Sequence, residues 1–225
     1  MTDRPINFRA PEILALLAGR KTQHRAIIKP QPCVEAVAGR FWVRENWRTP
    51  FVPDIDVDGQ RRAPPAAKLD PELTTIEYAA DGKHTLNAKT RSSIHMPRWA
   101  SRLTLIVESV KVERLQDISA EDAIAEGIYY DPPTAEDYEW NACYCEENGG
   151  DPTEPMEGVW RAPGTRQGWG PTKAQKESEQ WGPTAAFAFR CLWNYIHGAD
   201  AWEANPFVAA IIFRVIKANI DAEAS

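Results

Sequence analysis

The sequence has few histidines and none of the spacings by which catalytic zinc is usually held. Its 225 residues include four histidines and four cysteines. There is no H-E-x-x-H, and no H-x-E paired with C-x-x-C, the patterns of zinc proteases and zinc nucleobase deaminases. Cys143 and Cys145 form a C-x-C pair, far in sequence from Cys33 and Cys191, unlike a zinc ribbon or finger. We therefore expect reduced thiols and no metal or other cofactor, with a four-thiolate zinc site as the minor alternative.

Several other signatures are also missing. The sequence has no Walker or Rossmann glycine pattern and no G-x-S-x-G nucleophile elbow. No apolar run approaches the length needed to cross a bilayer, and residues 1–5 do not resemble a signal peptide. We expect a cytoplasmic protein with no membrane partner. We expect neither a P-loop nucleotide-binding enzyme nor an enzyme that binds a dinucleotide cofactor in a Rossmann fold.

Charge is unevenly distributed along the chain. The formal net charge is −6, which argues against a simple nucleic-acid-binding protein. Residues 129–183 hold eleven acids and four bases, whereas residues 1–50 hold nine Lys/Arg against four Asp/Glu. Residues 82–102 hold five Lys/Arg and no acid. The two basic segments are compatible with a polyanion or nucleotide site that the overall charge conceals.

Hydrophobic periodicity and capping residues predict an α+β fold in a single domain, 1–225. Hydrophobic residues make up 43% of the chain, and nine tryptophans fit a globular protein. The expected elements are a helix over 10–18 closed by Gly19, strands over 40–45, 74–80, 102–112 and 207–217, a helix from Ser119 to Gly127, and a helix from Thr184 to His197. Few βαβ crossovers are implied, so we expect a small, mostly antiparallel sheet or barrel.

Residues 129–183 are expected to form a long irregular insertion. They contain seven prolines, seven glycines and four tryptophans with little periodicity. Loops of this length in compact domains are usually functional or disordered. We interpret the segment as a lid over a cleft, with an acidic docking surface for another protein as the alternative.

Three segments together carry a family resemblance. The first is the loop Gly19–Arg25 (GRKTQHR), the second runs from Ser93 to Arg102 (SIHMPRWASR), and the third from Glu113 to Gly127. In this order they resemble the ASCH-domain proteins, specifically the larger type common in phages and prophages. The resemblance covers about residues 6–128 and 184–217. It implies a PUA-like fold, a small β-barrel with flanking helices around a cleft, and a role centred on RNA.

The resemblance also implies an activity. Small bacterial members of the family are amidohydrolases that remove the acyl group from N4-acylated cytidine. The family's catalytic lysine corresponds to Lys21 and its glutamate to Glu126, whereas His24 stands where the family has threonine. Thr22 offers a hydroxyl close to that position. We therefore expect a hydrolase of linear amides whose catalytic residues are Lys21, Glu126, His24 and Thr22.

The chemistry can be argued from the residues themselves. Amide hydrolysis needs a nucleophile, a base that removes its proton, and donors for the oxyanion. A lysine serves as the base only if its pKa falls well below its free value of about 10.4, and burial or neighbouring cations lower it. A histidine, with a free pKa near 6.5, can activate water in place of a threonine. The hypothesis requires Lys21 and Glu126 to meet in a partly dry cavity.

Substrate-binding roles are predicted for further cationic, aromatic and acidic residues, namely Arg20, Arg25, Trp42, Glu45, Arg98 and Trp99. Trp42 and Trp99, with Trp47, would supply the wall on which a base stacks. The alternative is that these residues have structural roles only. Lys21 would then be a solvated surface lysine, His24 a polar loop residue, and Arg98 and Trp99 a clamp that packs the fold without touching a ligand. The functional alternative is a module that binds RNA or a modified nucleotide without turnover, or a ribonuclease.

Overall fold

The computed structural model describes residues 3–28, 39–49, 54–55, 61–62, 69–82, 90–133, 135–148, 158–163 and 181–222. The chain divides into two compact units. Unit 1 comprises Met1–Thr22, Pro30–Lys111 and Ile211–Ser225, and unit 2 comprises Gln23–Lys29 and Val112–Ala210.

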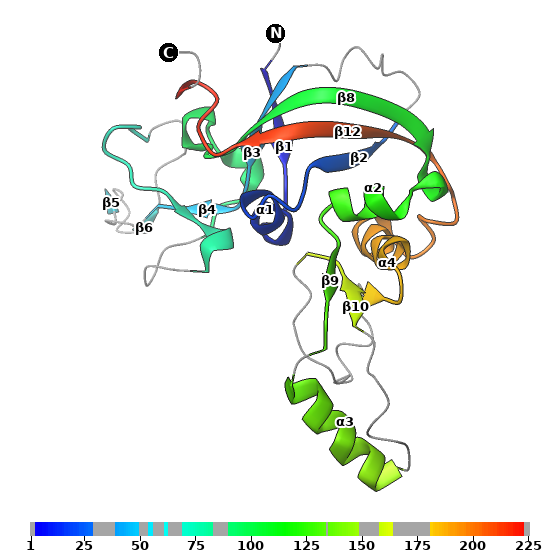
Figure 1. The fold of residues 1–225 in the computed structure, drawn as a ribbon. Coiled ribbons are helices and arrows are strands. Elements are labelled where there is room, and N and C mark those ends of the chain that lie inside the picture. Colours follow the sequence, from blue (N-terminus) through cyan, green and yellow to red (C-terminus); the bar gives the residue numbers. More distant parts are fainter. Residues whose placement is uncertain are drawn as a thin grey trace. The chain divides into compact units, whose positions relative to one another are not determined.

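The largest sheet has five strands, in the order β1-β3-β8-β12-β2. These strands are β1 (Asp3–Asn7), β3 (Arg40–Arg44), β8 (Thr104–Arg114), β12 (Phe207–Ile216) and β2 (Gln23–Ile27). β1 pairs with β3 in parallel, and β3 pairs with β8 antiparallel. The two longest strands, β8 and β12, are neighbours (Figure 1). Each contributes residues to both units.

Shorter elements complete the described chain. The helices are α1 (Ala10–Leu17), α2 (Ala120–Ala125), α3 (Ala135–Asn148) and α4 (Ala185–His197), with 3₁₀ helices at Ala79–Asp81, Ser93–His95, Arg98–Ala100 and Leu115–Asp117. The remaining strands are β4 (Trp47–Arg48), β5 (Asp54–Ile55), β6 (Arg61–Arg62), β7 (Glu77–Tyr78), β9 (Tyr129–Asp131), β10 (Val159–Arg161) and β11 (Trp181–Gly182). They form a three-stranded sheet, β11-β10-β9, and two two-stranded sheets, β4-β7 and β5-β6.

Helix ends follow the local sequence closely. Gly19 has φ +71°, its N–H donates to the Leu16 carbonyl, and the Arg20 N–H donates to the Ala15 carbonyl, which together make a Schellman motif. Ser119 caps α2 by accepting from the Asp122 N–H at 3.0 Å. Thr184 caps α4 in the same way from Phe187. The predicted helices are thus confirmed to within one or two residues.

Unit 1 has a small core beside the β4-β7 pair. Trp47, Met96 and Ala100 are buried there, with Tyr78 and Trp99 packed against them. The Tyr78 hydroxyl donates to the Ala100 carbonyl at 3.0 Å. Trp47 is fully buried, so it holds the core together and offers no open face on which a base could stack.

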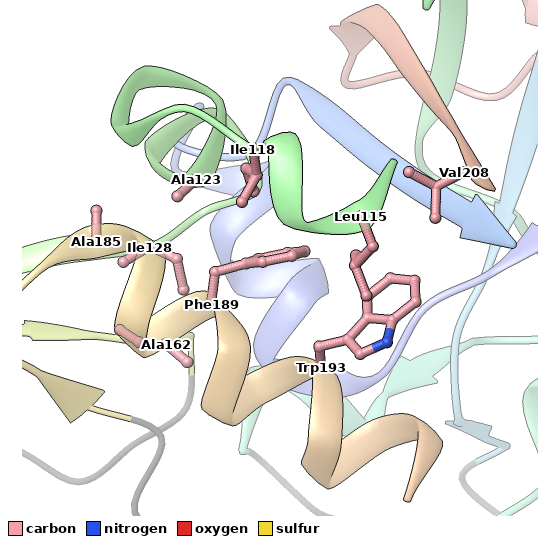
Figure 2. Close-up of a cluster of buried hydrophobic side chains, with 10 residues drawn as sticks. Leu115, Ile118, Ala123, Ile128, Ala162, Ala185, Phe189, Trp193 and Val208 are labelled. Carbon is pink, nitrogen blue, oxygen red and sulfur yellow. The ribbon is translucent and has the colours of Figure 1, made fainter. Parts of the chain in front are cut away.

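Unit 2 has the larger core, and α4 supplies its centre (Figure 2). Phe189 and Trp193 lie one turn apart on α4 with ring centroids 6.0 Å apart, and they belong to the same buried cluster as Leu115 and Val208. The other buried members are Ile118, Ala123, Ile128, Ala162, Ala185 and Ala188. Val208, Ala209, Ala210 and Ile211 are all buried, so this part of β12 is covered on both faces.

The α+β prediction is confirmed, with a core built mainly of sheet. Strand pairing in the described ranges forms an open five-stranded sheet and no closed barrel. The predicted β-rich run 74–80 is a strand only at Glu77–Tyr78, and Asp81 and Gly82 close a 3₁₀ helix. β7 pairs with the upstream β4, with Tyr78 opposite Trp47 and Glu77 opposite Arg48.

Residues 129–183 contain more regular structure than predicted. β9, β10 and β11 form their antiparallel sheet in unit 2, and the Trp160 ring lies 5.4 Å from the Tyr130 ring. α3 also belongs to this segment, and its mixed sequence, AEDYEWNACYCEEN, has no apolar stripe that would indicate a helix. Trp169 lies outside the described residues, as does Cys33. None of the helices described is both long and apolar enough to cross a bilayer.

Candidate functional site

A buried cluster in unit 2 joins one arginine to three carboxylates. The Arg25 guanidinium donates from Nη2 to Glu113 Oε1 at 2.6 Å and to Asp122 Oδ2 at 3.0 Å. Its Nη1 donates to Glu126 Oε1 at 3.1 Å. The Arg25 side chain has no exposed surface, and those of Glu113 and Glu126 are 6% and 3% exposed. These are charge-assisted hydrogen bonds in a dry environment, where geometry is held most firmly.

Local structure explains why these side chains converge. Asp122 and Glu126 are four residues apart, so they share one face at the end of α2. Gln23 and Arg25 are two residues apart, so they share one face of β2. When the Gln23 amide is oriented to satisfy both neighbours, its oxygen accepts from Arg25 and its nitrogen donates to Asp122 Oδ1 at 3.3 Å.

The position of Glu126 required a partner of this kind. Glu126 is the C-cap of α2, directly before Gly127, whose φ is +102°. A carboxylate at a helix C-terminus is unfavourable because the helix dipole is negative there. The Arg25 guanidinium compensates for this, and it fixes the orientation of the carboxylate.

Lys21 occupies a separate buried environment in unit 1. It is 2% exposed, its Nζ lies 3.7 Å from Glu12 Oε1, and it stands 5.7 Å above the Phe8 ring. The Schellman turn at Gly19 places it there, since Lys21 N–H donates back to the Ala15 carbonyl. Lys21 is therefore not a solvated surface lysine.

The rest of the Gly19–Arg25 loop is less enclosed. Arg20 and Thr22 are exposed, and His24 is half-buried. The Thr22 carbonyl accepts from the Phe213 N–H at 3.0 Å. Within this loop Lys21, Gln23 and Arg25 are buried whereas Thr22 and His24 are not, because strand alternation turns successive side chains to opposite faces.

A second buried ion pair lies in unit 1 around Glu45. Glu45 is 1% exposed and accepts from Arg102 Nε and Nη2 at 2.8 and 2.9 Å. Arg102 also contacts Asp81 and stacks 3.9 Å from the Tyr78 ring centroid. Burial raises the pKa of Glu45, and the Arg102 hydrogen bonds oppose that shift. Burial likewise raises the pKa of Tyr78.

The remaining predicted binding residues have structural partners in unit 1. Arg98 bridges Asp3 and Asp221, with 2.6 Å from its Nη2 to each carboxylate. The hydrogen bond from Arg98 holds the pKa of Asp3 below its usual value. Trp99 packs against the Trp47 core. Trp42 is half-buried under the Arg44 guanidinium at 5.4 Å. This environment fits the clamp interpretation of Arg98 and Trp99 made from the sequence.

Sequence reasoning missed Glu113, Asp122 and Gln23 of the cluster, and Glu12 beside Lys21. The i, i+4 spacing of Asp122 and Glu126, and the i, i+2 spacing of Gln23 and Arg25, were the available signals. No spacing within the sequence relates Arg25 to Glu113, because a tertiary contact alone joins them. Lys21 belongs to unit 1 and Glu126 to unit 2, and their joint action on one substrate stays a prediction.

Within the described ranges, no group of three or more His, Cys, Asp or Glu side chains is arranged to hold a metal ion. Among the described residues, Cys143, Cys145 and Cys191 form no disulfide. Comparisons with known protein families, with curated proteins and with solved structures found no match.

Proposed function

We propose that the protein is an amidohydrolase that removes the acyl group from N4-acylated cytidine or a related modified nucleobase. The burial of Lys21 is the observation that supports this most directly. A catalytic side chain must be held in a fixed position, and the Lys21 amine is held 3.7 Å from Glu12 Oε1 and 5.7 Å above the Phe8 ring. The proposal includes the PUA-like arrangement that the family resemblance implies.

The proposed step is hydrolysis of the bond between the acyl carbon and N4. The oxygen of a water molecule bonds to the acyl carbon, and one proton of that water passes to the general base, the role that the proposal gives to Lys21. The carbon–N4 bond then breaks, N4 takes up a proton, and a carboxylic acid and cytidine are released. His24, at the family's threonine position, assists by accepting a hydrogen bond from the attacking water.

Glu126 has the role of orienting the nucleobase of the substrate. Its carboxylate is fixed by Arg25, and a carboxylate fixed in this way can accept a hydrogen bond from an exocyclic amino group without rearranging. Glu113 and Asp122 position Arg25, so they support Glu126 without touching the substrate. Arg20, Trp42 and Glu45 keep their predicted binding roles as part of this proposal.

Hydrolysis of N4-acetylcytidine, followed by the ultraviolet change on loss of the acyl group, tests the proposal. We expect Lys21→Met, which keeps the aliphatic stem, to lower kcat/KM by about 10²-fold or more. The matched control is Lys217→Met at an exposed lysine of unit 1, which should leave activity within about two-fold.

Two results would overturn the hydrolase proposal. One is full activity in Lys21→Met. The other is no hydrolysis of N4-acetylcytidine, of bulkier N4-acylcytidines, or of RNA that contains them. If RNA binds in the second case, the protein is a binding module without turnover.

A further inference from the structure

Two aromatic residues of unit 1 each carry an arginine on the ring. The guanidinium carbon of Arg91 lies 5.0 Å from the centre of the Trp47 ring, and that of Arg102 lies 3.9 Å from the centre of the Tyr78 ring. Trp47 pairs with Tyr78 across β4 and β7, and an isolated antiparallel bridge joins it to Arg91 on its other side. Residues directly opposite each other in paired strands point to the same face. Arg91, Trp47 and Tyr78 therefore form one row on one face.

The two arginines differ in how their charge is compensated. Arg102 donates to the two Glu45 oxygens at 2.8 and 2.9 Å, and its Nη2 lies 2.8 Å from Asp81 Oδ1. At Arg102 the effect of burial on the pKa is outweighed by these hydrogen bonds, which raise it. At Arg91 burial lowers the pKa, and among the described residues no carboxylate opposes that shift. The row therefore has a compensated cation at one end and an uncompensated one at the other.

Two N–H donors at the Arg91 end of the row have no acceptor. Arg91 Nη2 and Trp47 Nε1 are buried, and neither has a hydrogen-bond partner in the described chain. A buried donor without an acceptor is unfavourable, and natural proteins keep few of them unless water or a ligand supplies the acceptor. Arg91 as a whole is half-buried, and its neighbours Thr90 and Ser92 are exposed, so this end of the row lies close to the surface.

The charge and the donors indicate what kind of ligand fits. One positive charge and two unpartnered N–H donors match the single negative charge and the two oxygens of a carboxylate. A phosphate monoester carries more charge and more acceptor oxygens than this pair can satisfy. Water supplies an acceptor but no charge to compensate the Arg91 guanidinium. At the other end of the row, Glu45 shows that a carboxylate is the group with which the chain itself compensates Arg102.

We propose that Arg91 and Trp47 form a binding site for the carboxylate group of a ligand. One carboxylate oxygen accepts a hydrogen bond from Arg91 Nη2, and the other accepts one from Trp47 Nε1. The bound carboxylate compensates the Arg91 guanidinium as Glu45 compensates Arg102. The site does not depend on the proposed hydrolysis, because neither residue has a part in that reaction.

Acetate titrated into the isotope-labelled full chain, followed by nuclear magnetic resonance, tests the site. Ionic strength is held constant with chloride. We expect the indole N–H signal of Trp47 to move downfield and to saturate, because a hydrogen bond to an anion deshields the proton. Acetamide has nearly the same shape without the charge, so it should leave that signal in place. A dipeptide with a free C-terminus, compared with its C-terminal amide, distinguishes a peptide carboxylate from a small free acid as the ligand.

Arg91→Gln should weaken acetate binding about ten-fold or more, the loss expected for one hydrogen bond to a charged group. Arg48→Gln is the matched control, because Arg48 follows Trp47 in β4 and therefore lies on the opposite face of the strand. It removes the same charge, and its acetate titration should equal that of the parent. Circular dichroism melting checks the fold of each variant. The comparison of acetate with acetamide in the parent keeps the test valid if Arg91→Gln does not fold.

The site is refuted if neither acetate nor the free-C-terminus dipeptide moves the Trp47 signal. It is also refuted if acetamide moves that signal as far as acetate does, because a neutral acceptor or a buried water then satisfies the donors. Equal acetate binding by Arg91→Gln and Arg48→Gln would have the same meaning. The signal is measured without any hydrolysis. Failure of this site therefore leaves the hydrolase proposal untouched, and failure of hydrolysis leaves the binding result untouched.

Discussion

Arg25 and Glu126 are 101 positions apart in the sequence, and their side chains meet at 3.1 Å in the interior of unit 2. The contact joins a strand near the amino end to the C-cap of a short helix. Glu113 and Asp122 accept from the same guanidinium. The cluster therefore links β2, β8 and α2 through charge as well as through the apolar core.

Replacing Arg25 should destabilise unit 2 strongly. Arg25→Met removes the donor of three charge-assisted hydrogen bonds from a dry site, and breaking a buried ion pair on one side costs about 3–5 kcal/mol. Urea denaturation followed by tryptophan fluorescence measures the loss. Arg190→Met is the control, because Arg190 and Glu203 are 45% and 63% exposed. An exposed pair contributes about 0–1 kcal/mol. Equal losses in the two variants would contradict the cluster's structural role.

Two carboxylates of unit 1 should affect the pH dependence of stability in opposite directions. Hydrogen bonds from Arg98 and Arg40 lower the pKa of Asp3 from 3.8, so the unfolded chain binds more protons there. Its stabilisation is present above pH 3.8 and is lost as pH falls through the folded pKa. Burial raises the pKa of Glu45 from 4.5, so its contribution is full below pH 4.5 and declines as pH rises through the folded pKa.

The free energy of unfolding, measured between about pH 3 and 7 where carboxylates titrate, should separate these effects. Asp3→Asn should make the rise in stability from acid to neutral pH shallower, by about 0.5–1 kcal/mol for an ion pair near the surface. Glu45→Gln should make that rise steeper, because it removes the opposing contribution. A shallower profile in Glu45→Gln would show that Arg102, and not burial, dominates at this position.

His24 should contribute to the hydrolase activity through its polar side chain. His24→Ala, which removes the group that holds the attacking water in the proposal, should lower kcat/KM by about 10²-fold. His24→Thr, which places the family's residue there, should retain most of the activity, because a hydroxyl can also hold the water. Steady-state kinetics of N4-acetylcytidine hydrolysis check this. Full activity in His24→Ala would remove His24 from the mechanism.

Gly19→Ala should cost stability through backbone strain alone. Gly19 has φ +71°, and a Cβ added there would meet nothing within 4 Å. A left-handed conformation costs an L-residue about 1–2 kcal/mol, and asparagine tolerates it better than alanine. Thermal unfolding should rank the parent above Gly19→Asn and that above Gly19→Ala. Ala18→Ser, at the neighbouring right-handed position, should have little effect.

The ends of the helices were predicted correctly from the sequence. Gly19, Ser119 and Thr184 set the ends of α1, α2 and α4, because caps depend on residues within a few positions of each other. Phe189 and Trp193 are buried on the predicted helix 184–197, four residues apart on one face. The helix dipole explains why a cation lies beside Glu126, and only the tertiary structure shows that this cation is Arg25.

Tertiary contacts decided the rest. β1 pairs in parallel with β3, and β4 pairs with β7, although both β4 and β7 are only two residues long. A two-residue strand is too short to show an alternating hydrophobic pattern, so it is identified only by the strand with which it pairs. The same reason applies to β9, β10 and β11, and the sequence therefore overstated how irregular residues 129–183 are.

The sequence by itself determined the α+β class, the helix ends and which loop carries the buried lysine. The tertiary structure alone shows that Arg25 pairs with three carboxylates and that Glu45 pairs with Arg102. The physical reason is that capping and periodicity act within a few residues. Charge pairing depends instead on distances in space, and residues 101 positions apart become neighbours only once the strands and helices have packed.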